Sequence, residues 1–221
     1  MWRKKAPQYT GPVTVFSVDH ILTQNSRDFF RNAGEGRGQR RSAPTKTVVL
    51  DAGSSVFASS GSWLSCAYAQ AGLFPDHLIA WERDYVEPKH YWSQVPPPFK
   101  PRVTFNNVAV VVESPTGGAS SPSPLRFIRE RTTPDDFVAF KLDIDSPKIE
   151  IGIAQQLQAD SAFHDLVDEF FFELHFNCEF HESCWGKDVA TTVAGQNLDR
   201  HSAMMLFYDL RKVGIRAHFW P

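Results

Sequence analysis

The sequence contains little cysteine, which excludes a fold held together by disulfide bonds. Of its 221 residues only Cys66, Cys178 and Cys184 are cysteines, an odd number that is too small for a disulfide framework. The composition therefore favours a reducing compartment. We expect a cytoplasmic protein, unless the chain is a domain excised from a longer one.

Long apolar runs are lacking as well. The sequence has no stretch of about 18 consecutive apolar residues, and it therefore predicts no segment that crosses a membrane. Residues 1–11 carry charges with no apolar core behind them, so we expect no signal peptide. Together these absences predict a soluble protein.

A strong net charge is also absent. The formal net charge is −2, which gives no global field for a nucleic-acid partner. The charge is unevenly placed, because residues 1–46 contain nine Lys or Arg and three Asp or Glu. We interpret residues 1–46 as a solvated basic arm and flexible loop; contact with a phosphate or an acidic partner is the alternative. Residues 47–221 would form one α/β domain.

What the chain does have is an alternation of β-rich runs with amphipathic segments. This alternation predicts a Rossmann-like, mostly parallel sheet with helices on both faces. We expect a loop between the third and fourth strands, while the segment 83–95 is compatible with helix or loop. In the last helix the periodicity predicts that Met204, Met205, Tyr208 and Leu210 pack inward. The expected strands are 47–53, 77–82, 102–113, 137–145, 168–176 and 215–220, and the expected helices are 54–72, 148–160 and 201–214.

Acidic residues follow two of these strands, at the edge where parallel sheets bind ligands. Asp51 and Gly53 close the first strand and lead into Ser54 and Ser55, and Glu82 closes the second strand. Glycine lets the backbone approach a ligand, and an acid after the second strand can bind the hydroxyls of a ribose. The pattern predicts a nucleotide site, with an ordinary turn and a surface glutamate as alternatives. The GxGxxG pattern of dinucleotide sites is missing at this turn.

The fourth strand brings three charged groups to the same edge. Its apolar run leads into Lys141, Asp143 and Asp145. A carboxylate in a dry cleft has a raised pKa and serves as a general base. The competing interpretation is that Asp143 and Asp145 only cap the following helix.

Several segments resemble those of class I S-adenosylmethionine-dependent methyltransferases, and most of all the FkbM-type group. They are, in order, TVVLDAGSS, LIAWE, VTFNNVAV, FVAFKLDIDSPKIEI and FFFELHF. The signature Lys-x-Asp-x-Glu-Gly-x-Glu of that group is similar to KLDIDSPKIEI, and its last helix and strand are similar to HSAMMLFYDLRKVGIRAHFW. The resemblance covers residues 45–220 and implies a methyltransferase that uses S-adenosylmethionine.

The resemblance also implies roles for individual residues. Asp51 and Gly53, with Ser54 and Ser55, would border the methionine part of the cofactor, and Glu82 would hold its ribose. Three residues would lie beside the adenine, namely Asn107, Val108 and Ala109.

At the methyl-transfer end the resemblance places Lys141, Asp143 and Asp145. Glu173 and His175 would close the far wall of the site. Asp143, Asp145 or His175 would act as the base that removes a proton from the methyl acceptor.

The chain departs from the family pattern in three ways. Ser55 and Phe57 stand where the family has Asn and a second Gly, and Phe57 would either crowd the cofactor or stack on it. Asp145 and Ser146 stand where the family has Glu-Gly. The antiparallel seventh strand of class I methyltransferases is not evident in the sequence.

We predict no metal site, although two groups of side chains resemble metal ligands. His175, Cys178, His181 and Cys184 follow one another at steps of three, which is not the spacing of a zinc finger. We interpret them as part of a loop. The alternative divalent site would hold Mg²⁺ between His175 and the two aspartates of the fourth strand.

The leading hypothesis is O-methylation of a small-molecule or sugar hydroxyl with S-adenosylmethionine. The alternative is a catalytically degenerate member that binds a ligand or a protein partner. A dehydrogenase is disfavoured by the missing glycines. A nucleic-acid methyltransferase would have to use the basic residues 27–46, and we do not expect one.

Overall fold

The structure is a computed structural model that describes residues 43–113, 122–174, 192–193, 196–197 and 200–220. The expected basic arm therefore lies outside the described residues, apart from its last four positions. No described helix has both the length and the apolar character that crossing a membrane requires.

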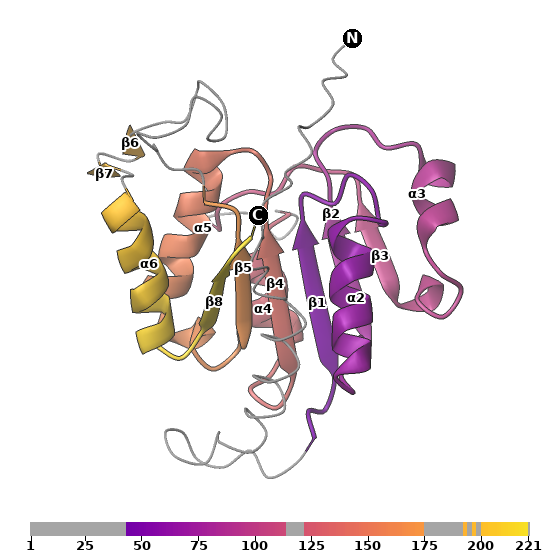
Figure 1. The fold of residues 1–221 in the computed structure, drawn as a ribbon, viewed down its shortest axis with the longest axis horizontal. Coiled ribbons are helices and arrows are strands. Elements are labelled where there is room, and N and C mark those ends of the chain that lie inside the picture. Colours follow the sequence, from indigo (N-terminus) through magenta and orange to yellow (C-terminus); the bar gives the residue numbers. More distant parts are fainter. Residues whose placement is uncertain (1–42, 114–121, 175–191, 194–195, 198–199, 221) are drawn as a thin grey trace, which may run out of the picture. The chain divides into compact units, whose positions relative to one another are not determined.

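Six strands form one sheet in which every neighbouring pair is parallel, as the arrows in Figure 1 show. They are β1 (Thr47–Ala52), β2 (His77–Trp81), β3 (Val103–Asn106), β4 (Phe137–Leu142), β5 (Glu169–Phe172) and β8 (Arg216–Phe219). Their order in the sheet is β3-β2-β1-β4-β5-β8. The expected fold class is confirmed, and the described part of this sheet contains no antiparallel strand. A separate hairpin pairs β6 (Thr192–Val193) with β7 (Gln196–Asn197).

Helices cover both faces of the sheet. They are α2 (Ser60–Gln70), α3 (Pro88–Gln94), α4 (Pro124–Arg131), α5 (Pro147–Ala159) and α6 (Arg200–Lys212), with short 3₁₀ turns at Lys100–Arg102 and Ser161–Phe163. In β1, Val48 and Leu50 belong to the core formed with α4, α5 and α6. Side chains alternate along a strand, so Val49 and Asp51 point to the opposite face. That face is packed by α2, which lies in front of the sheet in Figure 1.

The central strands β1 and β4 are buried along their whole length. A strand covered on both faces needs apolar residues on both, which explains why β1 and β4 are near-continuous apolar runs. The charged exceptions are Asp51 and Lys141, which lie opposite each other in the β1–β4 pairing.

The connection expected to be a loop between the third and fourth strands contains a helix, α4. Ser123 caps this helix by accepting a hydrogen bond from the backbone N–H of Arg126. The helix buries Leu125 and Ile128. The helix has only eight residues, and its Ser-Pro start is the sequence signal that indicates where it begins. The ambiguous segment 83–95 contains the short helix α3.

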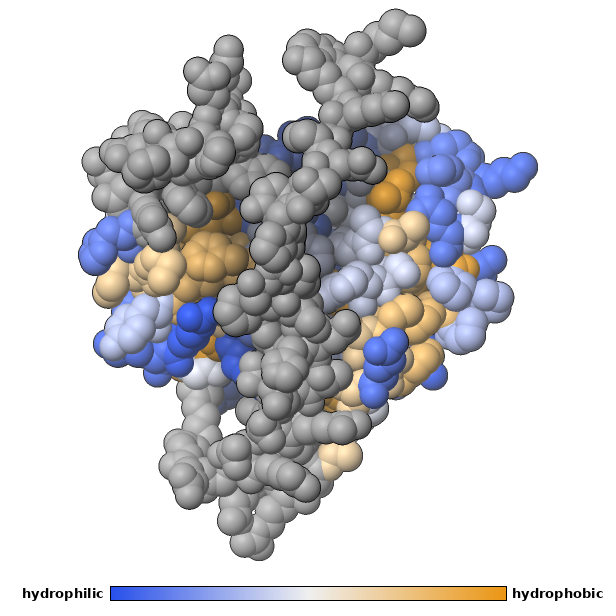
Figure 2. Space-filling model, viewed as in Figure 1, coloured by the Kyte–Doolittle hydropathy of each residue, from blue (hydrophilic) through white to orange (hydrophobic). Residues whose placement is uncertain are grey.

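The prediction of the buried face of α6 was wrong for three of four residues. Met204, Met205 and Tyr208 are 54%, 40% and 54% exposed, and only Leu210 packs inward as expected. Adjacent helical positions differ by about 100°, so a shift of one residue moves an apolar side chain out of the core. Figure 2 shows hydrophobic residues at the surface on the α6 side. The buried positions are Ala203, Phe207 and Leu210.

Three described glycines, Gly53, Gly72 and Gly214, have positive φ, and the first two lie in very different surroundings. Gly53 (φ +89°) follows β1, and a Cβ there would lie 1.5 Å from the carbonyl oxygen of Asp143. Gly72 (φ +82°) lies just after α2, and a Cβ there would meet no atom within 4 Å. Position 53 therefore requires glycine because the ends of β1 and β4 approach closely there. Position 72 favours glycine only because of its left-handed backbone angle.

We expect Gly53→Ala to destabilise the protein far more than Gly72→Ala. Both substitutions carry the left-handed penalty of about 1–2 kcal/mol. Only Gly53→Ala adds a clash with fixed backbone, which should bring its total to about 4 kcal/mol or more. Urea denaturation of both variants measures the difference. Equal losses in the free energy of unfolding would contradict the close packing of the two strand ends.

Candidate functional site

A pocket of about 530 Å³ opens at the carboxyl edge of the sheet. The chain connects β1 to β2 and β3 on one side and then returns to β4 on the other. The pocket thus lies at the point where the strand order reverses, which is where open α/β sheets bind ligands. The residues of the sequence prediction that line it are Gly53, Ser55, Glu82, Val108, Ala109, Lys141, Asp143 and Asp145.

The floor of the pocket is built around the ammonium group of Lys141. Its Nζ lies 3.3 Å from Oδ1 of Asp51 and 2.9 Å from Oδ2 of Asp143. It also donates to the carbonyl oxygens of Gly53 (3.0 Å) and Ala52 (3.4 Å). Burial alone would lower the pKa of Lys141, but the two carboxylates outweigh burial and raise it. Lys141 therefore stays charged and joins the ends of β1 and β4.

Asp51 lies beneath the pocket and does not line it. Its side chain is 0% exposed, and Ser60 at the start of α2 donates a hydrogen bond to its Oδ2 (2.7 Å). The carboxylate thus links β1, α2 and Lys141. Ser60 and Lys141, which both contact this carboxylate, line the pocket.

Several polar groups of the turn after β1 form hydrogen bonds within the protein. The backbone N–H groups of Gly53 and Ser54 both donate to the carbonyl oxygen of Trp81 (2.9 Å each). The Ser54 hydroxyl is buried 3.3 Å from the hydroxyl of Tyr91, so Ser54 does not line the pocket. Phe57 is also fully buried and meets Tyr91 edge-on, with ring centroids 6.2 Å apart. Phe57 therefore neither crowds the pocket nor stacks over it.

Glu82 and Asn107 form the wall after β2 and β3. Glu82 lines the pocket, and its Oε1 accepts a hydrogen bond from the N–H of Asp84 (2.9 Å). Asn107 lies outside the pocket and fixes the loop that carries Glu82. It donates to the carbonyls of Glu82 (2.8 Å) and Asp84 (2.6 Å) and accepts from the N–H of Val86 (2.9 Å). Asn107 thus positions the Glu82 loop from outside the pocket.

The loop after β4 is supported from below by a buried carboxyl group. Glu150, in the first turn of α5, is 1% exposed and accepts the N–H of Ile144 through Oε1 (2.8 Å). Burial raises the pKa of Glu150 to about 7. Asp145 has φ +53°, and the N-cap of α5 is Ser146. The helix cap is thus a residue other than the two aspartates, and Glu150 shapes the loop that presents them.

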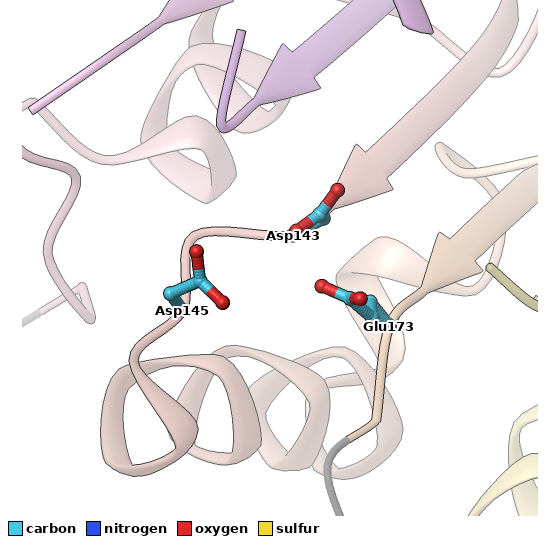
Figure 3. Close-up of side chains that lie close together, drawn as sticks. All are labelled: Asp143, Asp145 and Glu173. Atoms are coloured by element: carbon cyan, nitrogen blue, oxygen red, sulfur yellow. The ribbon is translucent and has the colours of Figure 1, made fainter. Parts of the chain in front are cut away.

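Three carboxyl groups converge beside this loop, as Figure 3 shows for Asp143, Asp145 and Glu173. One oxygen from each lies within 4.8 Å of the others. Burial, followed by a hydrogen bond and charge repulsion from Asp143, raises the pKa of Glu173 to about 8. Such a group can share a proton or coordinate a hard divalent cation. The expected partner His175 lies outside the described residues, as do Cys178, His181 and Cys184.

Sequence reasoning missed several residues that line the pocket. Ser59 and Ser60 come from the N-terminal end of α2, Ile149 from α5, and Trp220 directly follows β8. The place of Trp220 in the pocket was predictable from the sequence. It follows the last expected strand, and the carboxyl ends of parallel strands all lie at the same edge of the sheet.

Comparison with family models, curated proteins and solved structures found no match. The assignment of function therefore depends on the geometry and charge of the pocket.

We expect the substitution Glu173→Gln to change how stability depends on pH. The folded-state pKa of about 8 exceeds the ordinary value of 4.5. The favourable contribution of the protonated group is therefore complete below about pH 4.5 and is lost as the pH rises through about 8. Gln has no proton to lose, so the variant should gain stability relative to wild type between pH 5 and 8.5.

Thermal unfolding across this pH range, in buffer with EDTA, measures the effect. The surface variant Glu130→Gln is the control, because that side chain is 52% exposed and pairs with Arg126 on α4. Curves for Glu173→Gln and wild type that stay parallel at all pH values would rule out the raised pKa.

Proposed function

We propose that this protein is a methyltransferase that uses S-adenosylmethionine, with a small-molecule or sugar hydroxyl as the methyl acceptor. The single observation that carries the proposal is the arrangement of acids in one pocket. Glu82 lines it on the β2 side of β1, and Asp143 and Asp145 line it on the β4 side. This arrangement matches a ligand with a ribose at one end and a positive charge at the other.

The side of the pocket near β2 and β3 fits an adenosine. Glu82 offers carboxylate oxygens to a ribose diol. This side of the pocket is also lined by apolar side chains from the end of β2 and from the segment after β3, namely Trp81, Val108, Ala109 and Val110. An apolar slot beside a hydrogen-bonding acid is the usual composition of a nucleoside site.

The charges near β4 favour a cationic ligand over a dinucleotide. Asp143 and Asp145 line the pocket, and the charge of Lys141 is balanced by Asp51 and Asp143. A pyrophosphate would meet carboxylates here, whereas a sulfonium and an ammonium group would be attracted. The N-terminal end of α2, at Ser59 and Ser60, suits the ligand's own carboxylate.

S-adenosylmethionine supplies an electrophilic methyl group when it is bound. The side chains of this protein would align the acceptor and remove its proton. Asp143 is placed to accept the proton of an acceptor hydroxyl, because it lines the pocket and is held 2.9 Å from the Lys141 ammonium. Glu173, hydrogen-bonded to Asp143 and protonated below about pH 8, would release its own proton to solvent and then receive the one that Asp143 has accepted.

Isothermal titration calorimetry with S-adenosylhomocysteine tests the proposal, using wild type, Glu82→Gln and the control Glu130→Gln. Wild type and control should bind with the same affinity. Glu82→Gln should bind about 10- to 100-fold more weakly, because it loses charge-assisted hydrogen bonds to the ribose. Transfer of labelled methyl groups from S-adenosylmethionine to a cell extract then separates an enzyme from a non-catalytic binder.

Two results would count against the proposed function. One is the absence of binding by a folded wild-type protein, and the other is equal binding by Glu82→Gln and the control. Tight binding of NAD in the same titration would instead favour a dehydrogenase.

A further inference from the structure

Trp220 occupies the end of the pocket farthest from β3. It follows β8, and its backbone N–H donates to the carbonyl oxygen of Phe172 in β5 (3.0 Å). Trp63 of α2 and Phe171 of β5 meet its ring edge-on, with centroids 5.3 Å and 6.0 Å away. The indole ring is thus held by backbone and by two other aromatic rings, so its orientation is fixed before a ligand enters.

The face of the Trp220 ring is turned toward the charged centre of the pocket. The ammonium nitrogen of Lys141 lies over the ring, 5.8 Å from its centroid, and both residues line the pocket. The negative face of an aromatic ring attracts cations within about 6 Å. Asp51 and Asp143 already balance the charge of Lys141, so the ring borders a region of net negative potential.

The order of the strands fixes how a ligand would lie. Along the sheet edge, Glu82 follows β2, Asp143 follows β4 and Trp220 follows β8, in the order β2-β1-β4-β5-β8. If the ribose lies at Glu82, the remainder of the ligand extends across β1 toward Asp143 and Trp220. With the ligand's carboxylate at the N-terminal end of α2, as proposed above, the positively charged sulfur would lie on the side of Asp143 and Trp220.

We propose that Trp220 is a specificity-determining residue that recognises the sulfonium cation through a cation–π contact. This inference rests on the proposed function and names one residue of the same site. The methyl donor carries the positive charge, and the demethylated product is a neutral thioether. Trp220 would therefore favour binding of the donor over the product, which promotes exchange of product for a new donor molecule after each reaction.

The experiment compares two ligands on four proteins by isothermal titration calorimetry. The ligands are S-adenosylmethionine and S-adenosylhomocysteine, and the variants are Trp220→Leu, Trp220→Phe and the control Trp92→Leu. Trp92 is a half-buried aromatic residue of α3 that does not line the pocket. The measured quantity is the ratio of the two dissociation constants. A change in affinity that is the same for both ligands, such as one caused by a general loss of packing around Lys141, cancels in this ratio.

We expect Trp220→Leu to weaken binding of S-adenosylmethionine about 2- to 30-fold relative to S-adenosylhomocysteine, which is the range of a cation–π contact. Trp220→Phe should retain part of the preference, and Trp92→Leu should leave the ratio unchanged. Equal weakening of both ligands in Trp220→Leu, with preserved circular dichroism, would overturn the inference and leave the proposed function standing. If folded wild type binds neither ligand, both proposals fail.

Discussion

The fold and the candidate site both depend on the buried charge of Lys141. Its ammonium group binds the carboxylates of Asp51 and Asp143 and two carbonyl oxygens at the end of β1. Removing one partner from a buried ion pair costs about 3–5 kcal/mol, because the other charge is left without compensation in a medium of low polarity. The network therefore holds the ends of β1 and β4 close together, and this close approach is what requires glycine at position 53. It also holds the carboxyl group of Asp143 at the surface of the pocket.

The chemistry of the pocket follows from which strand ends the network brings together. Glu82 and Asp143 arrive from opposite sides of the reversal in strand order. In the proposed function, the excess of carboxylates over free cations would select the sign of the ligand's charge, and the apolar slot beside Glu82 would select its nucleoside part. Asn107 and Glu150 act one step away, because each fixes the loop that carries a pocket acid.

The sequence predicted the sheet and most of its edge residues, because β1 and β4 are apolar runs that end abruptly in charge. Roles that depend on tertiary contacts were not predictable. Asp51 lies beneath the pocket because side chains alternate along β1, and its side chain falls on the face of the sheet that α2 covers. Phe57 does not block the site, since its ring is buried against Tyr91. Trp220 lies at the pocket because β8 pairs with β5 in the sheet, and this pairing is a tertiary contact.

A crystal structure of the protein with S-adenosylhomocysteine tests the central claim most directly. We expect the ribose hydroxyls within hydrogen-bonding distance of the Glu82 carboxylate, the adenine beside Val108 and Ala109, and the sulfur between Asp143 and Trp220. Ligand bound in the reverse orientation would contradict the account of how charge selects the ligand. Ligand bound outside the pocket at the reversal of strand order would contradict the proposed site altogether.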